Sequence, residues 1–119
     1  MKSVLVIDDE PGIANLVSLC LDPLGVGVVS ARGLQSALDV AHNDEIGLVL
    51  LDIDLGEEDG LEILPCLRRD PRLARVPFVA FTAHDSRRRE AFAGGVVSFI
   101  GRPFAHAELR TAVETYLVR

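Results

Sequence analysis

Short apolar runs alternate along this chain with segments whose apolar residues recur every three or four positions. The runs have the length of β-strands, whereas the three-to-four spacing is typical of helices that bury one face. The predicted strands are Val4–Ile7, Val26–Ser30, Leu48–Asp52, Pro77–Phe81 and Val96–Ile100. A helical pattern follows each strand, over residues 11–24, 34–41, 61–67, a short stretch that ends at 94–95, and 109–117.

Five strand–helix units with short connections predict an α/β domain, in which helices cover both faces of a parallel sheet. Because crossovers between parallel strands are right-handed, few topologies remain. The strand order 2-1-3-4-5 of a flavodoxin-like, doubly wound five-stranded sheet with five helices fits best, and we expect residues 1–119 to form one such domain. In that order the switch point, where open α/β sheets bind ligands, lies between the first and third strands.

Prolines and glycines mark the expected helix ends. Pro11 opens the first helix, where its missing N–H has no cost, and Pro23 with Gly25 ends it. Pro65 falls inside the third helix, so we expect a kink or a late helix start there.

The composition is that of a globular domain. Hydrophobic residues make up 49% of the chain, and no apolar run reaches the roughly 18 residues that a membrane helix needs. The chain start leads directly into a strand, so we expect no signal peptide and a cytoplasmic location. The net charge of −6 argues against non-specific nucleic-acid binding. Cys20 and Cys66 are too few for a disulfide scaffold or a zinc site, and both are expected to be buried thiols on helix stripes.

Acidic residues end the first and third strands. Asp8 and Asp9 follow the first strand, and Asp52 closes the third. These are the two strands that border the predicted switch point, so their carboxylates should meet. Carboxylate oxygens, together with water and a phosphate oxygen, suit Mg²⁺. The alternative is that these acids are solvated strand ends, but three acids converging at a switch point favour a metal site.

Two further groups should reach the same edge of the sheet. Thr82 closes the fourth strand, and its hydroxyl there suits a phosphoryl oxygen. Arg102 follows the fifth strand, and the proline after it favours an extended backbone that directs its charge toward the acids. Taken alone, each residue is more often a loop cap or a surface charge.

Taken together, these residues resemble the receiver domain of two-component response regulators over the whole chain. Five blocks in order carry the resemblance: Val6-Ile7-Asp8-Asp9-Glu10-Pro11, Leu50-Leu51-Asp52-Ile53-Asp54-Leu55, Asp59-Gly60-Leu61-Glu62, Phe81-Thr82-Ala83, and Gly95 with Phe99-Ile100-Gly101-Arg102-Pro103-Phe104. Their order is far more specific than any single block.

The resemblance implies a role for each residue. Asp52 would accept a phosphoryl group from a phosphohistidine. Mg²⁺ would be held by Asp9, Asp52 and the backbone carbonyl of Asp54, with Asp8 acting through water. The phosphoryl oxygens would be bound by Thr82, the Ala83 N–H and Arg102, and Thr82 and Phe99 would form the switch.

The resemblance also implies partners and a mode of action. A sensor histidine kinase or phosphotransfer protein would donate the phosphoryl group, and the altered face of helix four, strand five and helix five would act on an output domain, an output protein or a second copy of the chain. The domain itself would bind neither nucleic acid nor membrane. It would be no enzyme beyond self-phosphorylation and autodephosphorylation.

One position departs from the family pattern. The family has lysine where this chain has Arg102. The one lysine of this chain, Lys2, precedes the first predicted strand and so lies at the opposite end of that strand from Asp8 and Asp9. Arginine is longer, planar and forked, so it either grips a phosphate with two N–H groups or locks onto Asp52 at rest. In the second case the chain would be a pseudo-receiver, a phosphorylation-independent interaction module.

Other features leave alternatives open. Asp52-Ile53-Asp54 also resembles the Asp-x-Asp motif of haloacid-dehalogenase-type phosphatases, although the short chain and the third-strand position disfavour it. The family resemblance places Asp54 and His84 at the site entrance. Glu57 and Glu58 are expected to be solvated. Residues 87–89 form an arginine run that is either solvated or a docking patch for an acidic partner.

Overall fold

The computed structural model describes residues 2–83 and 85–118, and five parallel strands form one sheet in the order β2-β1-β3-β4-β5. The strands are β1 Ser3–Ile7, β2 Val28–Ala31, β3 Ile46–Leu51, β4 Phe78–Thr82 and β5 Ser98–Gly101. The helices are α1 Pro11–Leu21, α2 Leu34–Asn43, α3 Gly60–Arg69, α4 Arg88–Ala93 and α5 His106–Tyr116, with a 3₁₀ turn over Asp22–Leu24. The predicted fold class and strand order are confirmed.

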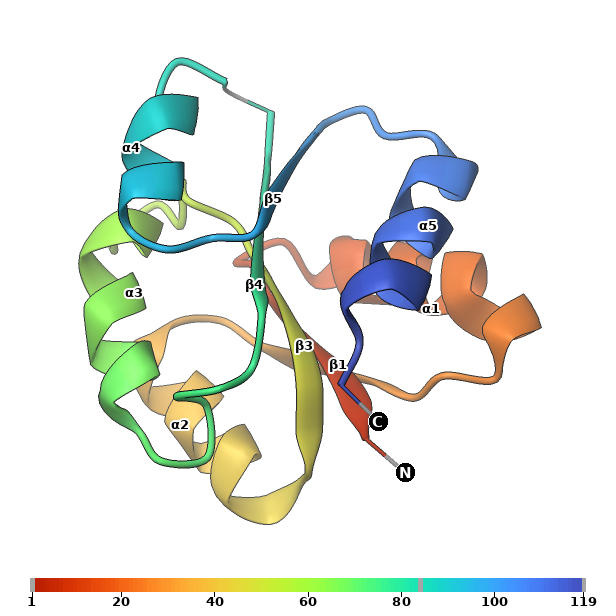
Figure 1. Cartoon of the computed structure of the whole chain (residues 1–119), viewed down its shortest axis with the longest axis horizontal. Helices are drawn as coiled ribbons and strands as arrows, with labels where there is room; N and C mark the ends of the chain where they lie inside the picture. Colours follow the sequence, from red (N-terminus) through yellow and green to blue (C-terminus); the bar gives the residue numbers. More distant parts are fainter. Residues whose placement is uncertain (1, 84, 119) are drawn as a thin grey trace.

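Helices cover both faces of the sheet, as Figure 1 shows: α1 and α5 lie on one side, and α2, α3 and α4 lie on the other. Each side has its own apolar core. All six residues of β3 are buried, because this central strand is covered on both faces. The two described chain ends lie near one another at the edge opposite the candidate site (Figure 1).

All five strands begin or end one or two residues away from the predicted ranges. Val26 packs against the core, yet β2 begins only at Val28, which pairs with Val4. Val96 is likewise buried before β5 begins at Ser98. The apolar pattern reports burial rather than ladder pairing, so it extends beyond each strand where the incoming loop is also buried.

Helix α1 ends earlier than its apolar stripe. The helix stops at Leu21, and a 3₁₀ turn then carries Pro23 to Gly25, whose φ of 65° is left-handed. Pro23 lies in the first turn of that 3₁₀ segment, where no N–H is required. Pro23 and Gly25 were predicted to end the helix, but they lie in and after the 3₁₀ turn, and the α-helix itself ends two residues before Pro23.

Helix α3 differs from expectation at two residues. It runs through Pro65, starting at Gly60 with its N-terminus capped by the Asp59 carboxylate, which accepts from Leu61 N at 3.0 Å. The prediction that Cys66 is buried was wrong: Cys20 is buried, but Cys66 is exposed. The buried stripe ends on Leu67, and Cys66 lies about 100° away from it around the helix.

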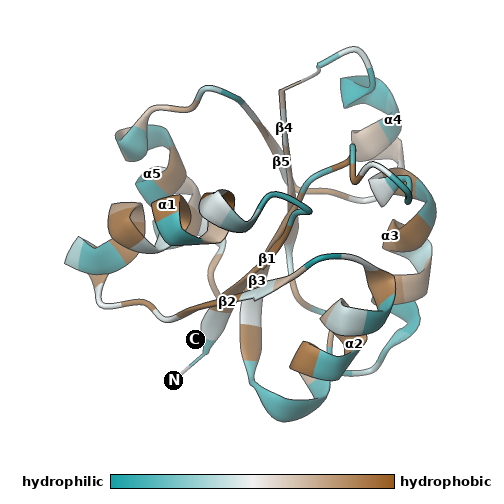
Figure 2. Ribbon diagram, turned by 180° about the vertical axis from the view of Figure 1, so that it is seen from behind, coloured by the Kyte–Doolittle hydropathy of each residue, from teal (hydrophilic) through white to brown (hydrophobic). Residues whose placement is uncertain are grey.

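Helix α1 presents an unusual outer face. Its eleven residues include no charged side chain, and its exposed surface carries Leu16, 40% exposed, and Leu19, 73% exposed. Figure 2 shows brown, apolar stretches on this helix beside white and teal ones. In the described part of the chain, no helix is long and apolar enough to cross a membrane.

Candidate functional site

Three carboxylates meet beyond the ends of β1 and β3. Ile7 pairs with Leu51 in the sheet, and Asp52 N donates to Ile7 O at 2.9 Å, so the two strand ends lie level. One carboxylate oxygen from each of Asp8, Asp9 and Asp52 lies within 4.8 Å of the others. The predicted convergence at the switch point is confirmed as geometry, and this oxygen set suits a hard divalent cation.

Local hydrogen bonds orient the two buried acids. Asp8 Oδ1 accepts from Glu10 N at 2.9 Å, and Asp52 Oδ1 accepts from Asp54 N at 3.0 Å. The Thr82 hydroxyl, buried at the end of β4, also donates to the Asp52 carboxylate. These short-range bonds follow from acids at strand ends, where the chain turns back toward the preceding side chain.

Burial raises the pKa of the Asp52 carboxyl to about 6. The nearby Asp8 carboxylate raises this pKa further, whereas the Asp54 N–H, Arg102 and the Thr82 hydroxyl oppose the shift. The Asp52 carboxyl therefore lies in a desolvated environment that disfavours its charged form, beside three groups that favour that form.

Arg102 lies among these acids. Its Nη2 donates to Asp8 Oδ2, lies 3.0 Å from Asp52 Oδ2, and donates to the Phe81 carbonyl at 3.1 Å. The guanidinium also lies 4.5 Å from the centroid of the Phe81 ring. In the structure Arg102 thus pairs with Asp52, as the second of its two predicted geometries requires, and also with Asp8.

A cleft of about 320 Å³ opens onto this cluster, and it brings together most of the predicted residues. Its walls include Asp9, Asp52, Asp54, Thr82, Ala83 and Arg102. Phe99 lies elsewhere: it packs in the core beneath α4, only 7% exposed, with the Arg88 guanidinium 5.3 Å from its ring centroid. His84 lies outside the described residues.

Two glycines shape the loop after β3. Gly56 has a φ of 76°, which proline cannot adopt, and a Cβ there would lie 3.0 Å from Asp9 Oδ2. At Gly60 a Cβ would lie 2.4 Å from the Asp52 carbonyl oxygen, so helix α3 approaches the Asp52 backbone closely. Neither of these close approaches was predicted from the sequence.

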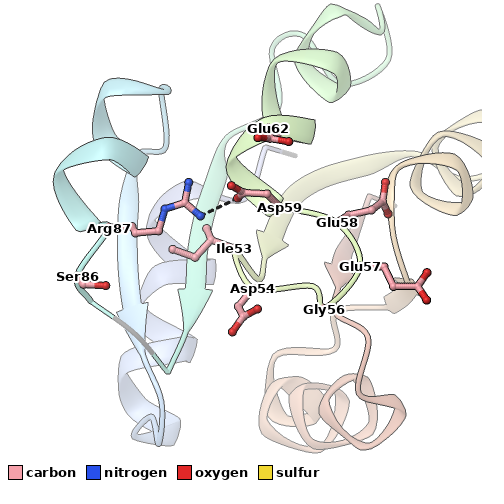
Figure 3. Close-up of a pocket in the computed structure, with 9 residues that line it drawn as sticks. All are labelled: Ile53, Asp54, Gly56, Glu57, Glu58, Asp59, Glu62, Ser86 and Arg87. Atoms are coloured by element: carbon pink, nitrogen blue, oxygen red, sulfur yellow. Dashed lines mark hydrogen bonds and ion pairs between the residues drawn. The ribbon is translucent and has the colours of Figure 1, made fainter.

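Sequence reasoning missed two ties that hold this loop. Glu58, predicted to be solvated, accepts from Leu34 N at the start of α2 at 3.1 Å. Arg87 reaches from the start of α4 to Asp59 at 2.7 Å, across a pocket of about 490 Å³ (Figure 3). Its other terminal nitrogen pairs with Glu90 at 2.7 Å, so the first arginine of the run is not simply solvated. Neither tie has a signal in local sequence, because each joins residues 24 or 28 positions apart.

The fold and the acidic cleft define a class of protein, the receiver domains of signalling pathways. The sequence model of the response regulator receiver domain matches residues 4–114, so the chain belongs to that family.

Individual relatives support this placement. The chain is 31% identical over 121 residues to the transcriptional regulator RpaA of Synechocystis, covering 100% of this chain but 50% of RpaA. It is 29% identical to the response regulator DivK of Brucella ovis, covering 98% of this chain and 96% of DivK. The crystal structure of the NtrX receiver domain from Brucella abortus has a TM-score of 0.85 at 30% identity, covering 97% and 98% of the two chains. The chain therefore spans half of one relative and nearly all of the others.

Proposed function

We propose that this protein is a phosphorylatable receiver, in which Asp52 accepts a phosphoryl group from a histidine kinase or phosphotransfer protein. The observation that carries the proposal is the meeting of three carboxylates with Thr82 and Arg102 at one cleft. We assign this activity to residues 1–119 as one receiver domain in the cytoplasm, acting as a signalling module rather than a turnover enzyme. The family match supports it over the phosphatase alternative.

The donor set fits Mg²⁺, because three carboxylate oxygens cluster within 4.8 Å. In the proposal Asp9, Asp52 and the Asp54 carbonyl bind the ion directly, and Asp8 acts through water. The ion supplies charge neutralisation for the transferred phosphoryl group. The hydrogen bonds to Asp8 and Asp52 from Glu10 N and Asp54 N hold these carboxylates in place before transfer.

The transfer itself needs positioning more than covalent assistance. An Asp52 oxygen forms the new bond to phosphorus as the bond from phosphorus to the histidine nitrogen breaks. The electron pair of that bond stays on the ring, which leaves as neutral imidazole when its other nitrogen is protonated. Thr82, the Ala83 N–H and Arg102 then bind the phosphoryl oxygens.

The output follows from the same contacts. The Thr82 hydroxyl, which now donates to Asp52, would move toward the acyl phosphate. Phe99 would fill the space that Thr82 leaves, and its ring carries the Arg88 guanidinium with it. The face of α4, β5 and α5 changes as a result, which presents a new surface to an output domain, an output protein or a second copy of the chain.

The donor would dock beside the cleft on α1. This helix begins two residues after Asp9, carries no charge and exposes Leu16 and Leu19. An apolar face next to the nucleophile suits a helical partner that brings its phosphohistidine to Asp52.

A second function is favoured by one contact. Because Arg102 pairs with both Asp8 and Asp52, the site carries its own counter-charge, as a pseudo-receiver would. Such a module would bind its partner without phosphorylation.

Intact-mass measurement separates the two functions. The protein is incubated with Mg²⁺ and acetyl phosphate, beside the Asp52→Asn variant. A receiver gains one phosphoryl group, and the variant gains none. If neither protein gains mass, and a phosphorylated histidine kinase also transfers nothing, the pseudo-receiver function holds.

A further inference from the structure

One nitrogen of Arg102 serves both buried acids of the cleft. The side chains of Asp8 and Asp52 are 2% and 8% exposed, and that of Arg102 is 14% exposed. Nη2 carries only two hydrogens but lies within reach of Asp8 Oδ2, Asp52 Oδ2 and the Phe81 carbonyl. Arg102 is thus held among three acceptors, in a place where water screens the charges poorly.

All four oxygens of the two acids are engaged. The Oδ1 atoms accept backbone N–H groups, and both Oδ2 atoms face the guanidinium. A divalent cation that uses the same carboxylates therefore meets a positive charge already in position. Two cations cannot share these oxygens closely, because their mutual repulsion is strong at low dielectric.

We infer that Arg102 is the internal counter-cation of the Asp8–Asp52 pair and sets the affinity of the cleft for divalent cations, which bind only as the guanidinium withdraws. The inference deepens the proposed function, since it concerns the same cleft. It assigns to Arg102 a positioning role that precedes any phosphoryl transfer.

The length and shape of arginine are essential to this role. A lysine at position 102 would end in a compact, strongly hydrated ammonium on a shorter stem, so it would reach less far between the two acids. Stacking on the Phe81 ring, 4.5 Å away, also favours a planar guanidinium over an ammonium. The arginine therefore holds the acids more completely than lysine would.

A second observation shows where the guanidinium could go. Its Nε is buried and has no hydrogen-bond partner among the described atoms. An unpaired buried donor is costly, and it is satisfied when an acceptor enters the cleft. If the guanidinium withdraws from Asp8, it can present Nε and one terminal N–H to a single tetrahedral anion, and Nε then gains its acceptor. Arginine binds phosphate with two parallel hydrogen bonds of this kind.

Calorimetric titration with MgCl₂ tests the inference on the wild type, Arg102→Lys and Arg102→Gln. We expect Mg²⁺ affinity to rise in that order, with Arg102→Gln binding about tenfold more tightly than the wild type, equivalent to about 1.4 kcal/mol. Arg75→Gln is the matched control: it removes the same charge from an exposed residue far along the chain and should leave the affinity within twofold.

Thermal unfolding with and without 10 mM MgCl₂ gives a second reading that needs no calorimetric heat. A tighter site gains more stability from the same ion, so the rise in Tm should be largest for Arg102→Gln. Circular dichroism confirms that each variant is folded before titration. Equal Mg²⁺ affinities in the wild type and Arg102→Gln, or no binding by any variant, would overturn the inference.

The outcome is independent of the phosphorylation test. If a phosphoryl adduct forms but the affinities are equal, the inference fails and the receiver function stands. If the affinities rise as expected but no adduct forms, Arg102 controls the metal site of a pseudo-receiver.

Discussion

The tie between Glu58 and helix α2 makes a prediction that can be worked through from the structure. The N-cap of α2 is Gly33, which has no side chain to accept from the first turn. Glu58 accepts from Leu34 N instead, at 3.1 Å, from the loop that follows the Asp52 strand. A lost helix cap costs roughly 0.5–2 kcal/mol, so Glu58→Ala should destabilise the protein by about 1 kcal/mol.

Gly33 lies directly against this carboxylate. A Cβ at position 33 would lie 1.9 Å from Glu58 Oε1, so Gly33→Ala should push the carboxylate away and remove the same cap. The backbone there is extended, with φ at −175°, so alanine adds no backbone strain. Alanine has less conformational entropy than glycine in the unfolded chain, which stabilises the folded protein by roughly 0.4–1 kcal/mol. The net cost of Gly33→Ala should therefore be about 0.5 kcal/mol.

A double-mutant cycle isolates the contact. Urea unfolding followed by circular dichroism measures the free energy of unfolding of the wild type, both single variants and the double variant. Glu58→Ala should cost about 1 kcal/mol in the wild type but close to nothing once Gly33 is alanine. Glu57→Ala, an exposed change of the same charge in the same loop, is the control and should stay within about 0.5 kcal/mol. Equal costs of Glu58→Ala in both backgrounds would refute the cap.

Three further predictions concern other elements. The hydrogen bond from Arg87 holds the pKa of Asp59 below its ordinary value, so this contact stabilises the fold above about pH 4, and the stabilisation is lost as pH falls through the folded-state pKa. Asp59→Asn should therefore lower the free energy of unfolding by roughly 0.5 kcal/mol at pH 7, as measured by urea unfolding. A difference from the wild type that stays constant down to pH 2.5 would contradict this. Cys20→Ser buries a hydroxyl and should lower stability by roughly 1–3 kcal/mol, whereas the exposed Cys66→Ser should change it by less than about 0.5 kcal/mol. Leu19→Glu should leave Tm unchanged but slow phosphoryl transfer from a histidine kinase and not from acetyl phosphate; equal rates with the kinase would remove α1 as the docking face.

The sequence predicted the fold because its signals are local. The run before Asp52 is apolar at every position, and β3 is buried on both faces, so its depth could be read directly, although the strand begins two residues earlier than predicted, at Ile46. The acids of the cleft were predictable for the same reason: each ends a strand, and parallel strands bring such ends to one edge.

Contacts that depend on the folded surface could not be read in this way. Glu58 appeared to be a loop acid because nothing near it in sequence shows that Leu34 N needs an acceptor. Cys66 appeared to lie on the buried stripe of helix α3 because the spacing of apolar residues along a helix leaves the edge of the stripe uncertain by one residue. The position of Arg102 was open between two geometries, since charge alone does not decide which acid a long side chain reaches.

The charges of the cleft make Arg102 compatible with the proposed receiver function. Asp8, Asp9 and Asp52 together bring three negative charges, and Arg102 with a divalent cation would bring three positive charges. A phosphoryl group on Asp52 would add negative charge to the cleft. The guanidinium would then leave Asp8 and pair with the phosphoryl oxygens instead. In the proposed function Arg102 would therefore oppose metal binding before transfer and favour the phosphorylated state after it. A receiver built in this way should bind Mg²⁺ more weakly than its Arg102→Lys variant but lose its phosphoryl group more slowly, and these two opposite effects distinguish a relocating arginine from one that simply blocks the cleft.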